Sequence, residues 1–542
     1  MQLLRRMASL CATIALSTLA MASVVDTTAP VFLTAPTVTA NTNPAAPLTA
    51  RVQLTTDEPT KVDIFVREAT RTYRFTASSS FSTTHDLPLI GFRPGRTFRI
   101  NVWIRDAAGN RTPWNGGFIF TTPPLPANFP PLHVTTSQPA LMEPGVTLTA
   151  MVWTTPTASN SGTYLVYLDN EGQVVWLCQL AATARDVMRL RNGNLVATLT
   201  NRLAEEIDPY GNIVTQWWAA RLGTAGAPPG ATFVDCDSFH HEFHELPDSE
   251  LGNFIALSTE MRTYPNYPTS EVNPAQTSPT GTVVGDVVVE FKRDGTLVRE
   301  LKLLDVLDPY RMCYGSLAGF YNALYGMSTY DWGHSNAAQV DFGDDAWVVS
   351  LRHQDAVVKV RRSDHSIAWI HGPHERWVAP WTQYLLTPLG GPFEWNYHEH
   401  SPDLDSAGNL TMFDNGNYRV TPPAIAAPTS SWYSRAVTFH IDPVAMTTQQ
   451  VWAYYGATPF LSDKFGDADP LPTTHNVLVT DGAKPDPNGA NLQYSRLVEV
   501  TTGSPSQVVY EVIVNDLTQP NASRFNWNLY RAERYHGLYP HQ

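Results

Sequence analysis

Charged side chains are scarce in this sequence, and positive ones are the scarcer sign. Only 16% of the 542 residues are charged, and 36 Lys and Arg against 50 Asp and Glu give a formal net charge of −14. A protein that binds nucleic acid normally carries a basic face, so this balance excludes nucleic acid as a general partner. Hydrophobic residues make up 43% of the chain, which indicates a folded globular protein rather than a disordered one.

Cysteine is also rare, and no Cys-x-x-Cys pair occurs, so zinc-ribbon and thioredoxin-like motifs are excluded. The four cysteines are Cys11, Cys178, Cys236 and Cys313. Cys11 lies in an N-terminal apolar segment that we expect to be removed. The other three allow one disulfide and one free thiol in an oxidising compartment, but their spacing does not choose the pair.

Long apolar runs are missing except at the N-terminus. There, Arg5 and Arg6 precede an apolar stretch over Ala8–Ala22, which ends in the small-x-small pattern Ala20-Met21-Ala22. This arrangement predicts a signal peptide over residues 1–22. The alternative is a retained N-terminal anchor, although the stretch is short for a membrane span. We therefore expect an exported protein, periplasmic or extracellular, with no membrane span in the mature chain.

Helical periodicity is absent from the region after the apolar segment. Short alternating strands separated by turn residues predict a small β-sandwich over residues 27–123. The stretch from Leu89 to Phe98, followed by Asp106-Ala107-Ala108-Gly109-Asn110, resembles a fibronectin type III domain. A proline-rich segment at residues 124–135 is expected to be a stiff linker.

Residues 136–542 repeat a loose unit of apolar strand, turn with Asp or Asn and Gly, and apolar strand. About six units follow one another at irregular spacings of roughly 40 to 65 residues, the range of propeller blades with inserted loops. The sequence therefore predicts an all-β protein in which a six-bladed β-propeller follows the small sandwich. A long two-sheet sandwich with insertions is the alternative.

Three of these units place histidines just before a strand. They are the segments His240–Pro247, Asp331–Asn336 and Tyr397–Ser401. Equivalent positions in propeller blades face one funnel, so His241, His334 and His400 are expected to converge, with Arg352 near the same axis. Considered singly, each histidine is as compatible with an exposed turn, and Arg352 with a structural ion pair. A metal site formed by His240, His241 and His244 is a further alternative.

The ordered motifs resemble the bacterial arylsulfate sulfotransferases. They are Asp331-Trp332-Gly333-His334-Ser335-Asn336, Ser350-Leu351-Arg352-His353-Gln354, Trp369-Ile370-His371-Gly372, the His240–Pro247 run, Glu399-His400 and Phe413-Asp414-Asn415-Gly416. The resemblance covers roughly residues 135–535. It implies a six-bladed propeller with an N-terminal β-sandwich, phenolic sulfate esters as donors and phenols as acceptors. It also implies no cofactor, and a homodimer in some members.

The resemblance also implies roles for individual residues. His400 would be the nucleophile that carries the sulfuryl group, and His241, His334, Asn336 and Arg352 would hold the sulfuryl oxygens. Either His240 or His241 faces the site, with His241 favoured. His398 is a rival or a substrate-binding neighbour of His400. Two departures from the family pattern are Glu399, where glutamine is usual, and the lack of cysteine from Thr387 to Tyr397.

These residue types suit transfer of a sulfuryl group. Neutral imidazole attacks an anionic ester without charge repulsion and divides one displacement into two ping-pong steps. Guanidinium donors stabilise the equatorial oxygens. Aromatic residues near the motifs could hold the phenol ring: Trp332, Trp377, Trp395, Tyr397 and Phe239. No Gly-rich nucleotide motif occurs. The alternatives are a metal-dependent propeller hydrolase or lyase, a non-enzymatic binding or adhesion propeller, and a sulfatase in which water replaces the acceptor.

Overall fold

The computed structural model describes residues 26–157, 160–247, 252–486 and 492–541. The expected signal peptide at residues 1–22 lies outside the described residues. Strands dominate, and the two α-helices of the described chain, α1 (Leu303–Val306) and α2 (Asn322–Tyr325), have four residues each. No helix in this part of the chain is long and apolar enough to cross a membrane. The all-β prediction is confirmed.

A small domain precedes the propeller and is built around one long strand. Its strands are β1 (Thr37–Ala40), β2 (Ala50–Glu68), β3 (Arg71–Thr76), β4 (Ser82–Leu89), β5 (Thr97–Arg105), β6 (Arg111–Pro113) and β7 (Phe118–Thr121). The first half of β2 pairs with β1 and β4, and its second half pairs with β3 and β5. Alternate residues such as Val52, Val62 and Ile64 are buried between the two layers.

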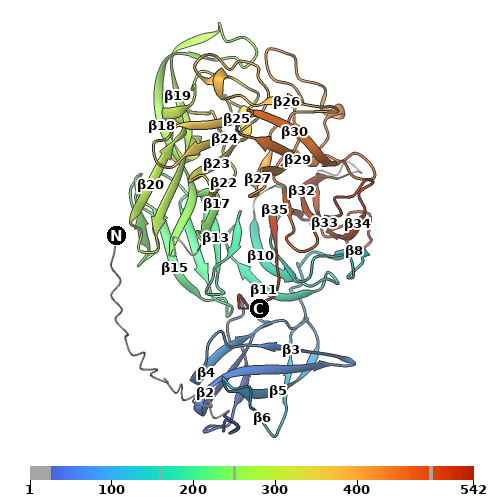
Figure 1. Cartoon of the computed structure of the whole chain (residues 1–542). Coiled ribbons are helices and arrows are strands. Elements are labelled where there is room, and N and C mark those ends of the chain that lie inside the picture. Colours follow the sequence, from blue (N-terminus) through green and yellow to red (C-terminus); the bar gives the residue numbers. More distant parts are fainter. Residues whose placement is uncertain (1–25, 158–159, 248–251, 487–491, 542) are drawn as a thin grey trace, which may run out of the picture.

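Six further sheets form the blades of a propeller (Figure 1). Blade one contains β9 (Val146–Thr154), β10 (Ser161–Leu168), β11 (Val174–Leu180) and β35 (Asn526–Tyr535). Blade two contains β12 (Val187–Arg189), β13 (Leu195–Thr200), β14 (Leu203–Ile207), β15 (Ile213–Ala219) and β16 (Thr232–Val234). Blade three contains β17 (His240–Glu245), β18 (Asn253–Pro268), β19 (Thr277–Lys292), β20 (Leu297–Lys302) and β21 (Tyr330–Asp331).

The other three blades follow in chain order. Blade four contains β22 (Ala338–Asp341), β23 (Ala346–Leu351), β24 (Ala356–Arg361) and β25 (Ile367–His371). Blade five contains β26 (Thr387–Leu389), β27 (His400–Leu404), β28 (Asn409–Asp414), β29 (Arg435–Asp442) and β30 (Thr447–Tyr454). Blade six contains β31 (Asp467–Pro470), β32 (Val477–Pro485), β33 (Gln493–Val500), β34 (Val508–Val514) and β8 (Leu132–Ser137). The predicted six-bladed propeller is confirmed.

Both ends of the propeller sequence close the ring. The C-terminal β35 pairs with β9 and completes blade one, while β8 pairs with β34 and extends blade six. Strand β8 begins at Leu132, directly after the last proline, Pro131, so residues 132–135 of the expected linker belong to blade six. These residues are held by backbone hydrogen bonds to β34.

The strands β35, β12, β17, β22, β27 and β31 are the innermost strands of blades one to six. Each blade core packs large apolar side chains between neighbouring sheets, for example Trp332 and Trp347 between blades three and four. This packing fixes the inner strands around one axis. Residues at the start of these strands therefore meet at one end of the central channel.

The C-terminal segment ties the small domain to the propeller. The Tyr539 hydroxyl accepts a hydrogen bond from the Ile90 amide at 3.0 Å and donates one to the Pro88 carbonyl at 3.1 Å. The Tyr539 ring stacks on Phe75 with centroids 5.2 Å apart. In Figure 1 the C-terminus accordingly lies between the propeller and the small domain.

The possible disulfide among the three remaining cysteines is not formed. Cys178, Cys236 and Cys313 are all free and buried. Cys178 and Cys236 lie in two separate hydrophobic clusters. Burial raises the pKa of all three thiols, so they behave as small apolar side chains of the core.

Candidate active site

The three histidines expected to converge do so at one end of the channel. His241 is the second residue of β17, His334 precedes β22 and His400 begins β27. The rings of His241 and His334 are 5.0 Å apart between centroids. Tyr530 of β35 links them to His400, at 5.7 Å from His241 and 6.2 Å from His400. We call this group of side chains the histidine chamber.

Two more histidines extend the chamber. His353 stacks on His334 with ring centroids 4.6 Å apart, and His398 lies 5.7 Å from His353. His398 also contacts Tyr418 at 5.1 Å. All of these imidazoles are nearly inaccessible to solvent. His398 therefore belongs to the group, on the side of His353.

The backbone at three of these histidines is left-handed. The φ angles are 58° at His241, 51° at His334 and 56° at His398. Residues other than glycine rarely adopt this conformation, and each instance costs of order 1 kcal/mol or more. Such strain gathers at functional sites, where the surrounding fold holds a side chain in one required direction.

The hydrogen bonds of His400 fix its tautomer. Asn415 donates its amide hydrogens to the carbonyls of Ser462 at 2.7 Å and Phe465 at 2.8 Å. Its Oδ1 is therefore the atom that faces His400, and it accepts from His400 Nδ1 at 2.7 Å. The hydrogen of neutral His400 is on Nδ1, so Nε2 carries the lone pair.

His240 lies behind His241 and orients it. His240 Nε2 lies 3.0 Å from the Ser258 carbonyl, which can only accept, so His240 Nδ1 carries a lone pair when the ring is neutral. His241 Nδ1 lies 2.8 Å from that atom and donates to it. His241 is thus the member of the pair whose Nε2 faces the chamber.

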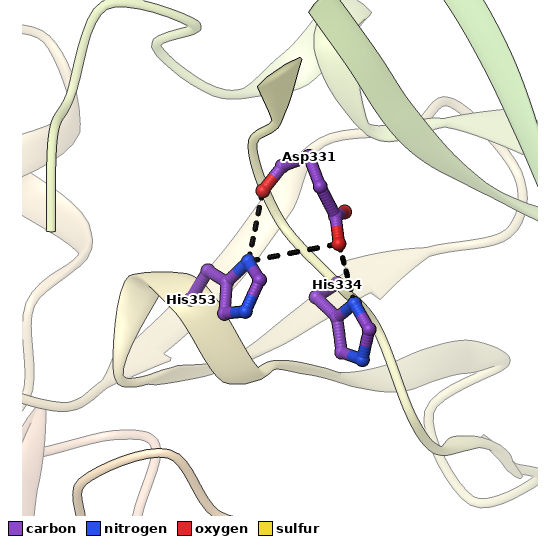
Figure 2. A group of neighbouring side chains, drawn as sticks. All are labelled: Asp331, His334 and His353. Carbon is purple, nitrogen blue, oxygen red and sulfur yellow. Dashed lines mark hydrogen bonds and ion pairs between the residues drawn. The ribbon is translucent and has the colours of Figure 1, made fainter. Parts of the chain in front are cut away.

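Asp331 anchors His334 and His353 from one side (Figure 2). Its carboxylate accepts from His334 Nδ1 at 2.5 Å, and its backbone carbonyl accepts from His353 Nδ1 at 2.8 Å. Figure 2 shows both rings turned so that Nε2 points away from Asp331. His398 follows the same pattern, because Asp355 Oδ1 accepts from its Nδ1 at 2.9 Å. These three rings thus share with His400 and His241 a tautomer with Nε2 unprotonated.

Asp331, His334 and His353 are also a possible set of metal ligands. One ligand atom of each lies within 4.8 Å of the others. The nitrogens closest to the carboxylate are engaged as hydrogen-bond donors in this arrangement. The alternative set of His240, His241 and His244 does not form, since His244 turns to Glu242 at 3.0 Å instead.

Two arginines supply the positive charge of the chamber. Arg352 follows β23 in the same short helical turn as His353, and its guanidinium donates to the Asp463 carbonyl at 3.1 Å. Arg185 precedes β12 and lies 5.8 Å from the Phe320 ring. Among the described residues neither guanidinium forms an ion pair with a carboxylate. Unpaired guanidinium groups next to one chamber indicate a site for an anion.

Burial determines the charge state of the histidines. It holds the pKa of His400 well below the usual value, and the nearby charge of Arg352 lowers it further. Burial followed by Arg352 lowers the pKa of His334, and burial followed by His334 lowers that of His241. The chamber therefore carries neutral imidazoles and two cations at neutral pH.

Asn336 and Glu399 hold the chain around His400. Asn336 is fully buried, donates to the Glu399 carbonyl at 2.7 Å and accepts from the Ser401 amide at 3.3 Å. The Asn336 side chain thus positions His400, and the contact with sulfuryl oxygens that the resemblance implies stays a prediction. The Glu399 carboxyl accepts from Ser350 and Asn396, and burial raises its pKa to about 8.

Two of the five aromatic residues near the motifs lie in blade cores, and another aromatic residue lies beside the chamber. Trp332 and Phe239 are fully buried in blade cores, which is the packing role of most aromatic residues in such folds. Phe320 instead lies at the edge of the chamber, 4.8 Å from His334, and is 42% exposed. Its ring is available to an aryl group that enters the chamber.

Sequence reasoning missed Arg185, Tyr530 and Phe320. Arg185 precedes the inner strand of blade two, as His334 precedes the inner strand of blade four. This equivalent position in the blade repeat was the signal that could have found Arg185. Tyr530 had no such signal, because β35 joins blade one only through closure of the ring. Phe320 lies in the loop before α2, outside the repeats.

The chain was compared with known proteins. The arylsulfotransferase family model matches residues 132–523, and the model of the arylsulfotransferase Ig-like domain matches residues 37–114. Arylsulfate sulfotransferase AssT of Escherichia coli O6:H1 is 33% identical over 214 residues, which are 32% of this chain and 35% of that protein. AssT of Lelliottia amnigena is 30% identical over 212 residues, with the same coverage. The alignments span about a third of each relative's length.

Solved structures give weaker likenesses. The periplasmic gluconolactonase PpgL of Pseudomonas aeruginosa has 12% identity and a TM-score of 0.30, over 71% of this chain and 100% of that chain. The family model, in contrast, covers more than two thirds of the sequence and contains all of the histidine motifs. The chain belongs to the arylsulfotransferase family.

Proposed function

We propose that this protein is an aryl-sulfate sulfotransferase that works by a ping-pong mechanism through a sulfohistidine on His400. The observation that carries the proposal is the fixed tautomer of His400, whose Nε2 lone pair belongs to a chamber with the unpaired cations Arg352 and Arg185. A nucleophile without charge, next to cations that bind the sulfuryl oxygens, is what attack on an anionic ester requires.

In the first step the Nε2 lone pair of His400 attacks sulfur. The N–S bond forms as the bond from sulfur to the aryl oxygen breaks, and the electron pair leaves with the phenolate. Charge spreads over the three equatorial oxygens, as in phosphoryl transfer. Arg352 and Arg185 stabilise this charge, and Phe320 supports the aryl ring.

In the second step an acceptor phenol replaces the first one. Its oxygen attacks sulfur, the N–S bond breaks, and the electron pair returns to His400 Nε2. The phenol proton passes to a neutral Nε2 in the chamber, and His334 is suited to accept it because Asp331 stabilises the resulting imidazolium. The proton then leaves to solvent, which restores the neutral chamber.

The experiment is transfer from p-nitrophenyl sulfate to phenol, with phenyl sulfate as the measured product. Wild type should form phenyl sulfate, a chelator should not change the rate, and His400→Ala should abolish transfer. His440→Ala, at an exposed histidine on β29, is the comparison and should retain transfer. Full activity in His400→Ala would contradict the proposal, as would inorganic sulfate as the sole product.

A second function is favoured by one observation, the possible ligand set of Asp331, His334 and His353. A metal-dependent hydrolase or lyase would use these residues as ligands. It predicts a bound metal in the purified protein and loss of activity with a chelator. The same assay with metal analysis separates the two functions.

Export and assembly are part of the proposal. The pattern of residues 1–22 supports export to the periplasm or beyond, which cell fractionation with N-terminal sequencing of the mature protein tests. A homodimer follows from the family resemblance alone, and size-exclusion chromatography with light scattering tests it.

A further inference from the structure

The central channel continues beyond the histidine chamber into an acidic cavity. The cavity has a volume of about 310 Å³ and is lined by the inner strands of the blades. Its acidic lining residues are Glu242, Asp403, Asp467, Asp469 and Glu533. Arg531 is the one arginine or lysine among the described residues that line it.

Arg531 separates the two parts of the channel. Its Nη1 donates to both carboxylate oxygens of Glu242 at 3.0 Å, and its Nη2 donates to the Asn336 carbonyl at 3.1 Å. The Tyr530 hydroxyl donates to the same carbonyl at 3.0 Å. Arg531 thus pairs with Glu242 and lies 3.7 Å from Asp186, and in the described part of the chain no ion pair joins it to Asp467, Asp469 or Glu533.

Three carboxylates meet on the far side of Arg531. Asp467 and Asp469 alternate on β31 and therefore face the same side, while Glu533 comes from the neighbouring β35. One oxygen of each lies within 4.8 Å of the others. We call these three residues the channel carboxylates.

Several of these oxygens are buried without a partner. Asp467 is only 2% exposed, and its Oδ2 has no hydrogen-bond partner in the described structure. Asp469 is partly buried, and its Oδ2 likewise has no hydrogen-bond partner in the described structure. Buried polar atoms in native proteins are nearly always paired, so each unpaired oxygen needs an explanation such as a bound ion.

Protons shared among the channel carboxylates are the competing explanation for these unpaired oxygens. Burial raises the pKa of Asp467 to about 6, and burial together with Asp467 raises the pKa values of Asp469 and Glu533. At neutral pH the three groups thus compete for protons in the absence of a cation. A cation removes the repulsion at the same place, and the cavity has room for the waters that complete its coordination.

We propose that Asp467, Asp469 and Glu533 bind a Ca²⁺ ion that ties blade six to the strand closing blade one. Only oxygen ligands are present, which favours a hard cation. Ca²⁺ accepts irregular geometry, whereas Mg²⁺ requires a near-ideal octahedron. An ion at this position would stabilise ring closure, because β35 is the C-terminal strand that pairs with β9 and completes blade one. The ion stabilises this closure and takes no part in the chemistry of the histidine chamber.

The test measures Ca²⁺ binding to the full-length protein after removal of metals. Isothermal titration calorimetry and the Tm should show binding and stabilisation by Ca²⁺, with a weaker response to Mg²⁺. Asp469→Asn and Glu533→Gln should each weaken Ca²⁺ affinity about tenfold or more. Without Ca²⁺ both variants should have a higher Tm than wild type, because each removes one repelling charge. A higher Tm also shows that the variants fold.

Two control variants locate the binding site. Glu58→Gln removes one member of a second acidic group, Asp26, Glu58 and Asp106, in the small domain. His334→Ala alters the possible metal ligands of the histidine chamber. Both controls should bind Ca²⁺ as wild type does. Loss of binding in either control, with unchanged binding in Asp469→Asn, would overturn the proposal.

A wild type without response to Ca²⁺ would also overturn it. The relevant range extends to about 1 mM, where weak extracellular calcium sites bind. If the Tm then rises only as the pH is lowered, shared protons explain the channel carboxylates. None of these measurements depends on sulfuryl transfer. Their outcome therefore tests the calcium site independently of the proposed function.

Discussion

His400 donates its Nδ1 hydrogen to Asn415 Oδ1 at 2.7 Å, and the two amide hydrogens of Asn415 are held by backbone carbonyls on the other side. This amide cannot turn over without placing an NH₂ group against the ring. The relationship fixes both the direction of the ring and the nitrogen that carries the lone pair. It makes Asn415 a positioning residue for the proposed nucleophile.

Asn415→Ala should therefore lower kcat with little change in KM. The ring loses its fixed tautomer, and a histidine in the wrong tautomer costs a triad enzyme about 10⁴ in kcat. We expect about 10² or more here, measured by steady-state transfer from p-nitrophenyl sulfate. Asn409→Ala at the other end of β28 is the matched control and should keep its kcat. An equal loss in both variants would point to a general effect on blade five.

Arg185→Gln and Arg352→Gln should each lower kcat/KM by about a hundredfold. The loss of one donor to a transition-state anion costs about 3 kcal/mol. Arg352→Lys should recover only part of the loss, because an ammonium group lacks the planar fork of donors. Arg361→Gln, an exposed arginine on β24, is the control. If kcat/KM of Arg185→Gln equals that of this control, the role of Arg185 is to hold Phe320 and its loop in place instead of binding the sulfuryl oxygens.

The sequence predicted the parts of this site that repeat with the blades. His241, His334 and His400 were found because each lies at the same phase of its unit. Arg185 has that phase as well, but blade two shows no histidine motif and its inner strand has only three residues. The position of Tyr530 depends on β35 pairing with β9, a contact between the two ends of the propeller sequence that no local pattern reveals.

The directions in which the site side chains point could also not be predicted from the sequence. The motif that contains Asn336 implied a contact with the sulfuryl oxygens, but it gave no sign that the amide also binds the backbone on both sides of His400. Left-handed backbone at His241 and His334 decides where those rings point, and such conformations depend on the packing of neighbouring blades. The disulfide that the cysteine count allowed is not formed, since all three thiols are free and Cys178 and Cys236 lie in separate hydrophobic clusters.

Sulfate binding should be coupled to proton uptake. The pKa of His334 and that of His241 are depressed by burial and by neighbouring positive groups, and a bound anion opposes that depression. Affinity for inorganic sulfate should thus rise as the pH is lowered from neutral. Calorimetry in two buffers of different ionisation enthalpy measures the protons taken up. His334→Gln should take up fewer, and equal uptake would assign the protons to another group.

Glu399→Gln should change how stability depends on pH. Burial raises the pKa of the Glu399 carboxyl to about 8 in the folded protein, whereas in the unfolded chain the group ionises near pH 4.5. The folded state retains the proton between these values and the unfolded state does not. The contribution of Glu399 to the free energy of unfolding is thus most favourable below pH 4.5. It declines up to about pH 8 and is constant above that pH.

The substitution removes this contribution and keeps the shape of the side chain, since a glutamine can still accept from Ser350. The gain in stability of Glu399→Gln over wild type should consequently grow from pH 5 to pH 8, as measured by urea unfolding. Glu375→Gln, at an exposed position in the loop after β25, should show no such trend. A difference between Glu399→Gln and wild type that stays constant with pH would mean that Glu399 is ionised in the folded protein. In that case the carboxylate would lower the positive charge beside His400, and activity should rise in Glu399→Gln at every pH.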